Sequence, residues 1–289
     1  MRIVVTGATG FIGKHVVRRL IQCGHSVVAV SRDIKSASGI DWFNNIEFIQ
    51  CDLHEDFKPI ISLINPSDVI VHFAWSGLPN YQDYFHISQN MQKDLKFLEN
   101  VLRSGIKQIL VAGTCLEYGM QCGPLSEDME TKPTTPYGFA KDVLRKSLQF
   151  MQDNVHFTLQ WLRIFYVFGE GQNKNSMLSQ LDRAIQRGDK VFNMSKGDQL
   201  RDYMPVEDVA TAIEVLLRYP QLNGVINCCS GKPISIYDLA LRYCSEKNSS
   251  IILNRGYYPY PDYEPMAFWG SRAKLDQLSF LQNSTAKGC

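Results

Sequence analysis

A glycine-rich turn near the start of the chain limits the folds that this sequence can adopt. The apolar run at residues 2–7 leads into TGATGFIG, where Gly7, Gly10 and Gly13 follow a G-x-x-G-x-x-G spacing. An amphipathic helical pattern at residues 13–24 follows directly, so the turn joins a predicted strand to a predicted helix. Glycine has no Cβ, and such a turn lets backbone N–H groups at a helix N-terminus approach a pyrophosphate. The turn therefore predicts a dinucleotide-binding unit more strongly than a glycine-rich turn without a ligand.

Strand-like and helical patterns alternate through the first half of the chain. Further strands are predicted at residues 26–32, 46–53, 67–75, 107–114 and 156–165, with helices at residues 90–105 and from 136 onwards. Strands that are apolar throughout and alternate with helices indicate a parallel sheet covered on both faces. We therefore expect an α/β fold with a Rossmann-like, doubly wound parallel sheet.

The texture of the sequence changes after residue 168. We predict that residues 1–168 form the cofactor-binding domain and that a helix and a strand within 204–230 return to it. Residues 169–203 and 231–289 are rich in Gly, Pro, Asn and Tyr. They predict a smaller, loop-rich C-terminal region that binds the substrate.

The composition argues against several classes of partner. With 289 residues and a net charge of +1, the chain has no excess of basic residues for binding nucleic acid. No apolar run reaches the length of a membrane span, and no signal peptide is expected. The eight cysteines form no Cys-x-x-Cys pair, so we expect reduced thiols in a cytoplasmic protein, without a disulfide framework or a metal site.

The end of the second predicted strand bears on the choice of nicotinamide cofactor. An acidic residue at this position binds the adenosine ribose and favours NAD. Here Ser31 and Arg32 occupy the position, and Asp33 lies beyond the strand end. A hydroxyl and a guanidinium can hold a 2′-phosphate through charge-assisted hydrogen bonds. The sequence therefore favours NADP(H) over NAD(H).

A tyrosine and a lysine lie one helical turn apart in PTTPYGFAKDVL. Thr135 is a suitable N-cap, and Pro136 suits the first position of a helix. Tyr137 and Lys141 then share one helix face. A Tyr-x-x-x-Lys match is common by chance, and by itself it predicts only a solvated first turn.

Five motifs, in their order and spacing, resemble one family. They are TGATGFIG at 6–13, Asp52-Leu53, GTCLEYG at 113–119, PYGFAK at 136–141 and RDYMPVEDVA at 201–210. They are similar to extended short-chain dehydrogenases/reductases, the group of nucleotide-sugar epimerases and dehydratases. The resemblance implies that Thr114, Tyr137 and Lys141 are the catalytic residues. The implied cofactor contacts are Gly7, Thr9, Gly10, Phe11, Ile12, Gly13, Ser31, Arg32, Asp52, Leu53, Phe73, Ala74, Trp75, Tyr137 and Lys141.

The resemblance also implies a division of labour among the catalytic residues. The Lys141 ammonium, together with an oxidised nicotinamide, should lower the pKa of Tyr137 from about 10. Tyr137 would exchange a proton with the substrate oxygen, and Thr114 would donate a hydrogen bond to that oxygen. Lys141 would also bind the nicotinamide ribose, while the nicotinamide supplies the hydride.

The expected substrate is a nucleotide-diphospho-sugar. In members of the family the arginine of the RD-[FY] motif binds the diphosphate, and the matching residue here is Arg201. The implied substrate contacts are Trp75, Thr114, Glu117, Tyr137, Tyr166, Asn175, Arg201 and Tyr260. Glu117 stands where an apolar residue is common, so it either contacts the substrate or forms a local ion pair.

The residues after Thr114 narrow the expected reaction. Dehydratases of the family carry an Asp-Glu pair there, and this chain has Cys115 and Leu116. This difference argues against dehydration and leaves a 4-ketoreductase or a 4-epimerase. The stretches HFAWSGLPNY, GTCLEYG and GYYPYPDYEPMAFWG resemble a group of bacterial surface-polysaccharide enzymes. That resemblance implies NADPH-dependent reduction of a C4 ketone, with dTDP-4-dehydro-6-deoxyglucose as substrate and dTDP-D-fucose as product. A 4-epimerase with bound NAD and a reductase of CDP-4-keto sugars stay open, as does a non-catalytic NADP-binding regulator. Members of the family often form homodimers through the helices that contain Asn90 and Tyr137.

Overall fold

The computed structural model describes residues 1–260 and 262–278. Its centre is a seven-stranded parallel sheet with the strand order β11-β7-β5-β4-β1-β2-β3. These strands are β1 (Arg2–Thr6), β2 (Ser26–Ser31), β3 (Glu47–Gln50), β4 (Val69–His72), β5 (Gln108–Thr114), β7 (Thr158–Ile164) and β11 (Gly224–Cys228). The predicted Rossmann-like α/β fold is confirmed, and β11 pairs with β7 at the edge of the sheet.

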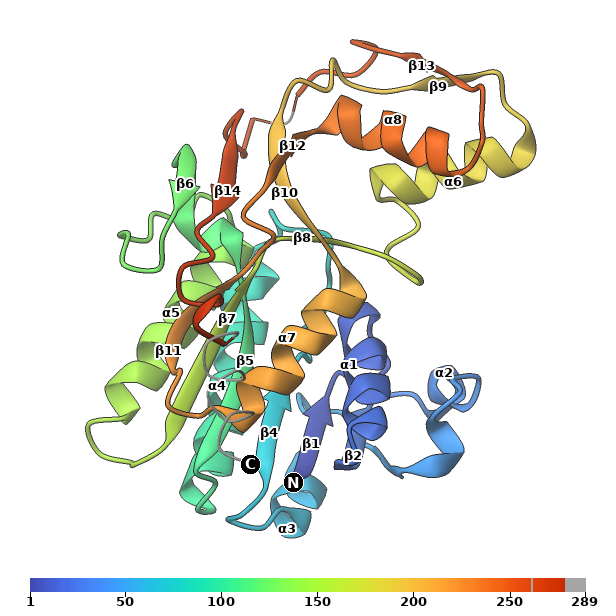
Figure 1. Ribbon diagram of the computed structural model, residues 1–289. Coiled ribbons are helices and arrows are strands. Elements are labelled where there is room, and N and C mark those ends of the chain that lie inside the picture. The colour runs from blue at the N-terminus through green and yellow to red at the C-terminus, as the bar shows by residue number, and fades with distance from the viewer. Residues whose placement is uncertain (261, 279–289) are drawn as a thin grey trace, which may run out of the picture.

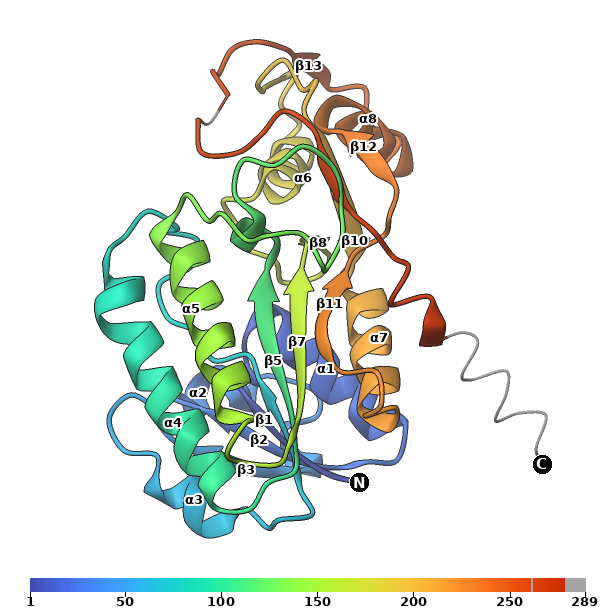
Figure 2. The same cartoon turned by 90° about the vertical axis from the view of Figure 1, so that its left-hand side faces the viewer.

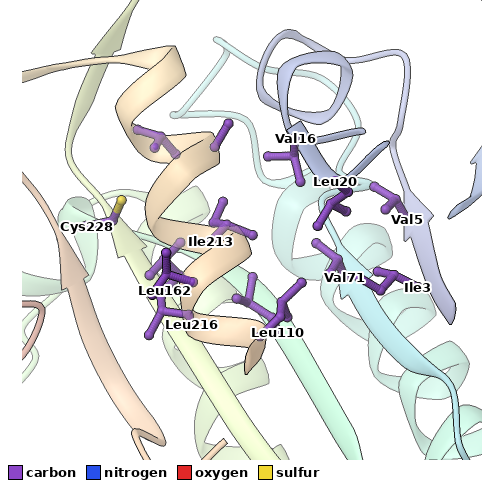
Figure 3. Close-up of a cluster of buried hydrophobic side chains, with 14 of the residues drawn as sticks. Ile3, Val5, Val16, Leu20, Val71, Leu110, Leu162, Ile213, Leu216 and Cys228 are labelled. Carbon is purple, nitrogen blue, oxygen red and sulfur yellow. The ribbon is translucent and has the colours of Figure 1, made fainter. Parts of the chain in front are cut away.

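Each face of the sheet has its own apolar core, because successive strand residues point to opposite faces. Ile3 and Val5 of β1 pack into one core, whereas Val4 between them packs into the other. The helices of the first face are α1 (Phe11–Gln22) and α7 (Val206–Arg218), and those of the second are α3 (Lys58–Leu63), α4 (Gln92–Arg103) and α5 (Pro136–Met151). Figure 2 shows α4 and α5 on one side of the sheet and α1 and α7 on the other. Figure 3 shows side chains of the first core, including Ile213 of α7.

A smaller lobe stands over the carboxyl edge of the sheet (Figures 1 and 2). It contains the helices α6 (Met177–Arg187) and α8 (Ile236–Glu246) and the strand pair β9 (Val191–Asn193) and β13 (Ile252–Asn254). The short strands β8 (Tyr166–Phe168), β10 (Leu200–Pro205) and β12 (Pro233–Ser235) form a second sheet, and β6 (Gly123–Leu125) pairs with β14 (Phe268–Gly270). The sequence predicts a loop-rich region here and does not predict α6 and α8, although a serine N-cap precedes each of these helices. Ser176 and Ser235 each cap a helix through their hydroxyls.

Short helical segments connect several of these elements. They are α2 (Ile34–Ser38), η1 (Phe43–Asn45), η2 (His86–Met91) and η3 (Cys115–Tyr118). η2 is a π-helical turn that runs directly into α4. Across the described ranges, every helix is too short or too polar to cross a bilayer.

Candidate active site

The glycine-rich turn is built so that the backbone closes tightly after β1. Gly7 has a φ of +67°, and a Cβ there would lie 2.6 Å from the Ala74 nitrogen. A Cβ on Gly13 would collide with the Gly7 carbonyl oxygen. Gly10 is the N-cap of α1, and no side chain caps the first turn of that helix. Free N–H groups at a helix N-terminus, in a turn with no room for side chains, fit a pyrophosphate.

A cleft begins at this turn and runs along the carboxyl ends of β1, β2 and β4. It is lined by Gly7, Thr9, Gly10, Val30, Ser31, Arg32, Cys51, Asp52, Leu53, His54, Phe73, Ala74, Trp75 and Ser76. Ten of the fifteen residues expected at the cofactor are among them. The five that do not line the cleft are Phe11, Ile12, Gly13, Tyr137 and Lys141. Ile12 packs against the first core, and the Phe11 ring lies edge-on to His15. Four further residues line the cleft although the motifs do not indicate them: Val30, Cys51, His54 and Ser76.

The end of β2 presents a hydroxyl and a guanidinium to this cleft. The Ser31 Oγ lies 2.7 Å from Thr9 Oγ1, and Arg32 Nη1 donates to Ser76 Oγ at 3.2 Å. Asp33 instead caps α2, because its carboxylate accepts from Lys35 N at 2.8 Å and from Ser36 Oγ at 2.6 Å. The Ser36 and Lys35 hydrogen bonds lower the pKa of Asp33. The carboxylate nearest the strand end is therefore engaged by its own helix.

Thr114, Tyr137 and Lys141 meet at the end of β5. Thr114 is the last residue of β5, while Tyr137 and Lys141 lie on the first two turns of α5. The predicted helix start is confirmed: Thr135 Oγ1 accepts from Gly138 N at 3.0 Å, and Pro136 is the first residue of α5. All three side chains are buried, with Lys141 only 1% exposed.

Burial dominates the proton affinities of these groups. It raises the pKa of Tyr137 above its usual value, and the Thr114 hydroxyl opposes this through a hydrogen bond. We predicted a lowered Tyr137 pKa from the Lys141 charge, but in the protein chain alone desolvation of the phenolate is the larger effect. Burial also lowers the pKa of Lys141 to about 8, although Asp94 and Glu117 favour its charged form. The Lys141 Nζ lies 3.8 Å from the ring centroid of Trp75.

Glu117 lies beneath Thr114 and is not among the residues that line the cleft. Its side chain is fully buried, and Oε1 accepts from Thr114 N at 2.9 Å in a capping box. Oε1 also accepts from Trp161 Nε1 at 2.9 Å, and Oε2 accepts from Arg163 Nε at 2.8 Å. These partners engage both carboxylate oxygens, so the structure contains the local ion pair that was one of the two predicted alternatives.

A second polar cluster lies where β8, β10 and the segment before β14 meet. Arg201 is 1% exposed, and its Nη2 donates to Glu264 Oε2 at 3.0 Å. The Tyr166 hydroxyl donates to Glu264 Oε1 at 2.6 Å. The Arg201 guanidinium also lies 4.7 Å from the Phe268 ring centroid. Sequence patterns do not indicate Glu264, because its partners are 63 and 98 residues away along the chain.

The two other expected substrate residues bond to groups outside this cluster. Tyr260 bonds through its hydroxyl to Asp198, accepting from the backbone N at 3.3 Å and donating to Oδ2 at 3.1 Å. Asn175 is exposed, and its backbone N donates to Asn173 Oδ1 at 2.8 Å. None of their described hydrogen bonds involves Thr114, Tyr137 or Arg201, and their contacts with the substrate stay predictions.

The sequence profile of the NAD dependent epimerase/dehydratase family matches residues 3–229. The chain belongs to this family. Among curated relatives, it is 32% identical to a dTDP-6-deoxy-L-talose 4-dehydrogenase (NAD(+)) of Aggregatibacter actinomycetemcomitans, over 94% of this chain and 100% of that protein. It is 24% identical to a dTDP-4-dehydro-6-deoxyglucose reductase of Escherichia coli, over 82% of this chain and 79% of that protein.

Solved structures of the epimerase/dehydratase family share the fold. A UDP-N-acetylglucosamine 4-epimerase of Methanobrevibacter ruminantium, in complex with UDP-N-acetylmuramic acid, superposes with a TM-score of 0.84 at 25% identity. The match covers 96% of this chain and 92% of that one. MoeE5, in complex with UDP-glucuronic acid and NAD, gives a TM-score of 0.81 at 24% identity, with the same coverage.

Proposed function

We propose that this family member is an NADPH-dependent ketoreductase acting at C4 of a nucleotide-diphospho-4-keto-6-deoxyhexose. The observation that carries the proposal is the convergence of Thr114, Tyr137 and Lys141 at the end of β5, beside the cleft at the glycine-rich turn. Two relatives support the position of the chemistry, because both are named for dTDP-6-deoxy sugars and for C4 or its ketone. The favoured conversion is dTDP-4-dehydro-6-deoxyglucose to dTDP-D-fucose, for cytoplasmic synthesis of surface polysaccharide.

The residues of the site would each bind one part of the cofactor or of the sugar substrate. The N-terminus of α1 and the glycine-rich turn would bind the pyrophosphate, and Lys141 would bind the nicotinamide ribose. A bound reduced nicotinamide supplies the hydride. Tyr137 donates the proton to the C4 oxygen, and its raised pKa keeps the phenol protonated at neutral pH. The Thr114 hydroxyl donates a hydrogen bond to the same oxygen.

The cofactor preference can be tested at Arg32. Arg32→Ala should weaken NADPH binding by roughly tenfold or more, since a charge-assisted hydrogen bond to the 2′-phosphate is lost. NADH binding should be nearly unchanged, and titration of both cofactors measures the difference. Lys35→Ala is the matched control, because Lys35 is an exposed cation of α2 that does not line the cleft. Equal losses for NADPH and NADH, or equal use of both by the native protein, would contradict the preference.

The pH dependence of reduction can be tested through Lys141. The ammonium is charged below its pKa of about 8 and neutral above it. We therefore expect kcat/KM for NADPH to be level between pH 6 and about 8 and to fall about tenfold per pH unit above that. A profile that stays level to pH 10 would remove the role of a titrating Lys141.

The competing function is a 4-epimerase that retains NAD. A UDP-glucose 4-epimerase of Halalkalibacterium halodurans is 26% identical over 83% of this chain, and a solved 4-epimerase shares the fold. An NADPH-oxidation screen over 4-keto-6-deoxy sugars linked to dTDP, CDP, UDP or GDP separates the two functions. A reductase consumes NADPH stoichiometrically, whereas an epimerase consumes none.

A homodimer through α4 and α5 fits the proposal, since Phe139 and Phe150 of α5 are 46% and 74% exposed.

A further inference from the structure

We propose that Trp75 is a positioning residue that holds the Lys141 ammonium against its ring face, and that His86 fixes the Trp75 indole for this task. This inference deepens the proposed function and rests on it, because the role of Lys141 in catalysis is part of that function. The contacts among Trp75, His86 and Lys141 are between protein residues and do not depend on the proposed function.

The Lys141 ammonium is buried without a close counterion. Its side chain is 1% exposed, and among the described residues no carboxylate oxygen lies within salt-bridge distance of Nζ. A buried charge is costly unless another group compensates for the lost water. The Trp75 ring face lies 3.8 Å from Nζ and provides that compensation as a desolvated cation–π contact.

The indole is held in this orientation by a chain of two hydrogen bonds. Trp75 Nε1–H donates to His86 Nδ1 at 3.0 Å, and His86 Nε2–H donates to the Asn80 carbonyl at 2.9 Å. This arrangement requires a neutral imidazole with its proton on Nε2. Burial lowers the pKa of His86, and the Lys141 charge acts in the same direction. His86 therefore stays an acceptor for the indole at neutral pH.

The same aromatic groups surround the catalytic tyrosine. The Tyr137 ring lies 5.8 Å from Trp75 in an edge-on arrangement and 5.3 Å from the His86 ring. Tyr81 is 5.5 Å away, and its carbonyl accepts from Tyr137 N at 3.2 Å. A change in Trp75 thus reaches both the phenol and the ammonium.

Other charged groups face Lys141 from neighbouring elements, but each is engaged elsewhere. Asp94 Oδ1 of α4 accepts from His54 Nε2 at 2.9 Å while Oδ2 lies 3.7 Å from His72 Nε2, and Glu117 of η3 pairs with Arg163 at 2.8 Å. Both favour the charged form of Lys141 from a distance. Trp75 is the group in direct contact, so its removal should show most clearly in the proton affinity of Lys141.

The test measures the Lys141 pKa by NMR in the protein without cofactor. The protein is labelled with 13Cε-lysine, and Lys141→Arg assigns the resonance. We expect Trp75→Leu to lower the Lys141 pKa by about one unit, the equivalent of a desolvated cation–π contact. Trp75→Phe keeps an aromatic face and should titrate close to the native protein. An unchanged pKa in Trp75→Leu, or an equal fall in Trp75→Phe, would overturn the proposal.

Three further variants separate this role from a general loss of structure. Trp75→Met fills much of the same volume without a ring, and it replaces Trp75→Leu if that variant does not fold. His86→Leu removes the acceptor of the indole and should lower the Lys141 pKa, whereas His86→Gln retains an acceptor and should lower it less. Equal pKa values in the two His86 variants would contradict the part assigned to His86.

The readouts also distinguish the two proposals. If the NMR shift appears and no 4-keto sugar is reduced, the proposed function fails and the Trp75 contact stands. If reduction occurs but neither the pKa nor the basic limb of kcat/KM moves in Trp75→Leu, the Trp75 contact fails and the function stands.

Discussion

Replacing Tyr137 with phenylalanine should lower kcat for reduction by about 100-fold or more, the usual contribution of a general acid. The change removes only the hydroxyl, and the ring keeps its contacts with Trp75, Tyr81 and His86. NADPH binding should therefore survive. Steady-state rates and cofactor titration, measured side by side, check the two halves of this expectation.

The matched control for this change is Tyr84→Phe. Tyr84 is 67% exposed and lies outside the site. The substitution removes the same hydroxyl group as Tyr137→Phe does. Its kcat should equal that of the native protein. A near-native kcat in Tyr137→Phe would show that another group donates the proton.

Replacing Arg201 with alanine should raise KM for the nucleotide sugar by roughly tenfold or more, because a charge-assisted bidentate contact with the diphosphate is lost. NADPH affinity should not change, since Arg201 does not line the cleft at the glycine-rich turn. Arg255→Ala is the matched control: Arg255 belongs to the same lobe, is partly exposed and pairs with Asp198. An effect on NADPH with none on the sugar would remove Arg201 from the substrate site.

Glu264 allows a second test of diphosphate binding at Arg201. Its carboxylate already pairs with Arg201 at 3.0 Å, so a diphosphate at this guanidinium has to take its place. Glu264→Gln keeps the shape and removes the competing charge, and it should lower KM for the sugar. A raised KM would instead mean that Glu264 itself binds the substrate.

The parts of the site that the sequence predicts are those set by short-range rules. Thr135, Pro136 and the Tyr137–Lys141 spacing specify the start of α5, and the structure has that start. The same holds for the glycine-rich turn, whose Gly7 needs a positive φ. Such features depend on neighbours within a few residues, so a single sequence contains them.

The sequence does not show hydrogen-bond partners that are distant along the chain. Glu117 pairs with Arg163, 46 residues away, and Tyr260 with Asp198, 62 residues away. The chemistry of both side chains suits a substrate contact, and only the fold shows which protein groups they bond to. The pKa of Tyr137 is raised in the protein chain alone for a related reason: the spacing places a charge nearby, but it does not reveal the burial of the phenol.

Transfer of deuterium to C4 tests the central claim most directly. The protein is incubated with dTDP-4-dehydro-6-deoxyglucose and NADPH that carries deuterium at both C4 positions of the nicotinamide, and the product is examined by NMR and mass spectrometry. We predict one deuterium at C4 of a dTDP-6-deoxyhexose, with one NADPH oxidised per product. Neither NADPH consumption nor deuterium at C4, together with tightly retained NAD and interconversion of the C4 epimers of a dTDP-6-deoxyhexose supplied in place of the ketone, would contradict the reductase and establish the epimerase.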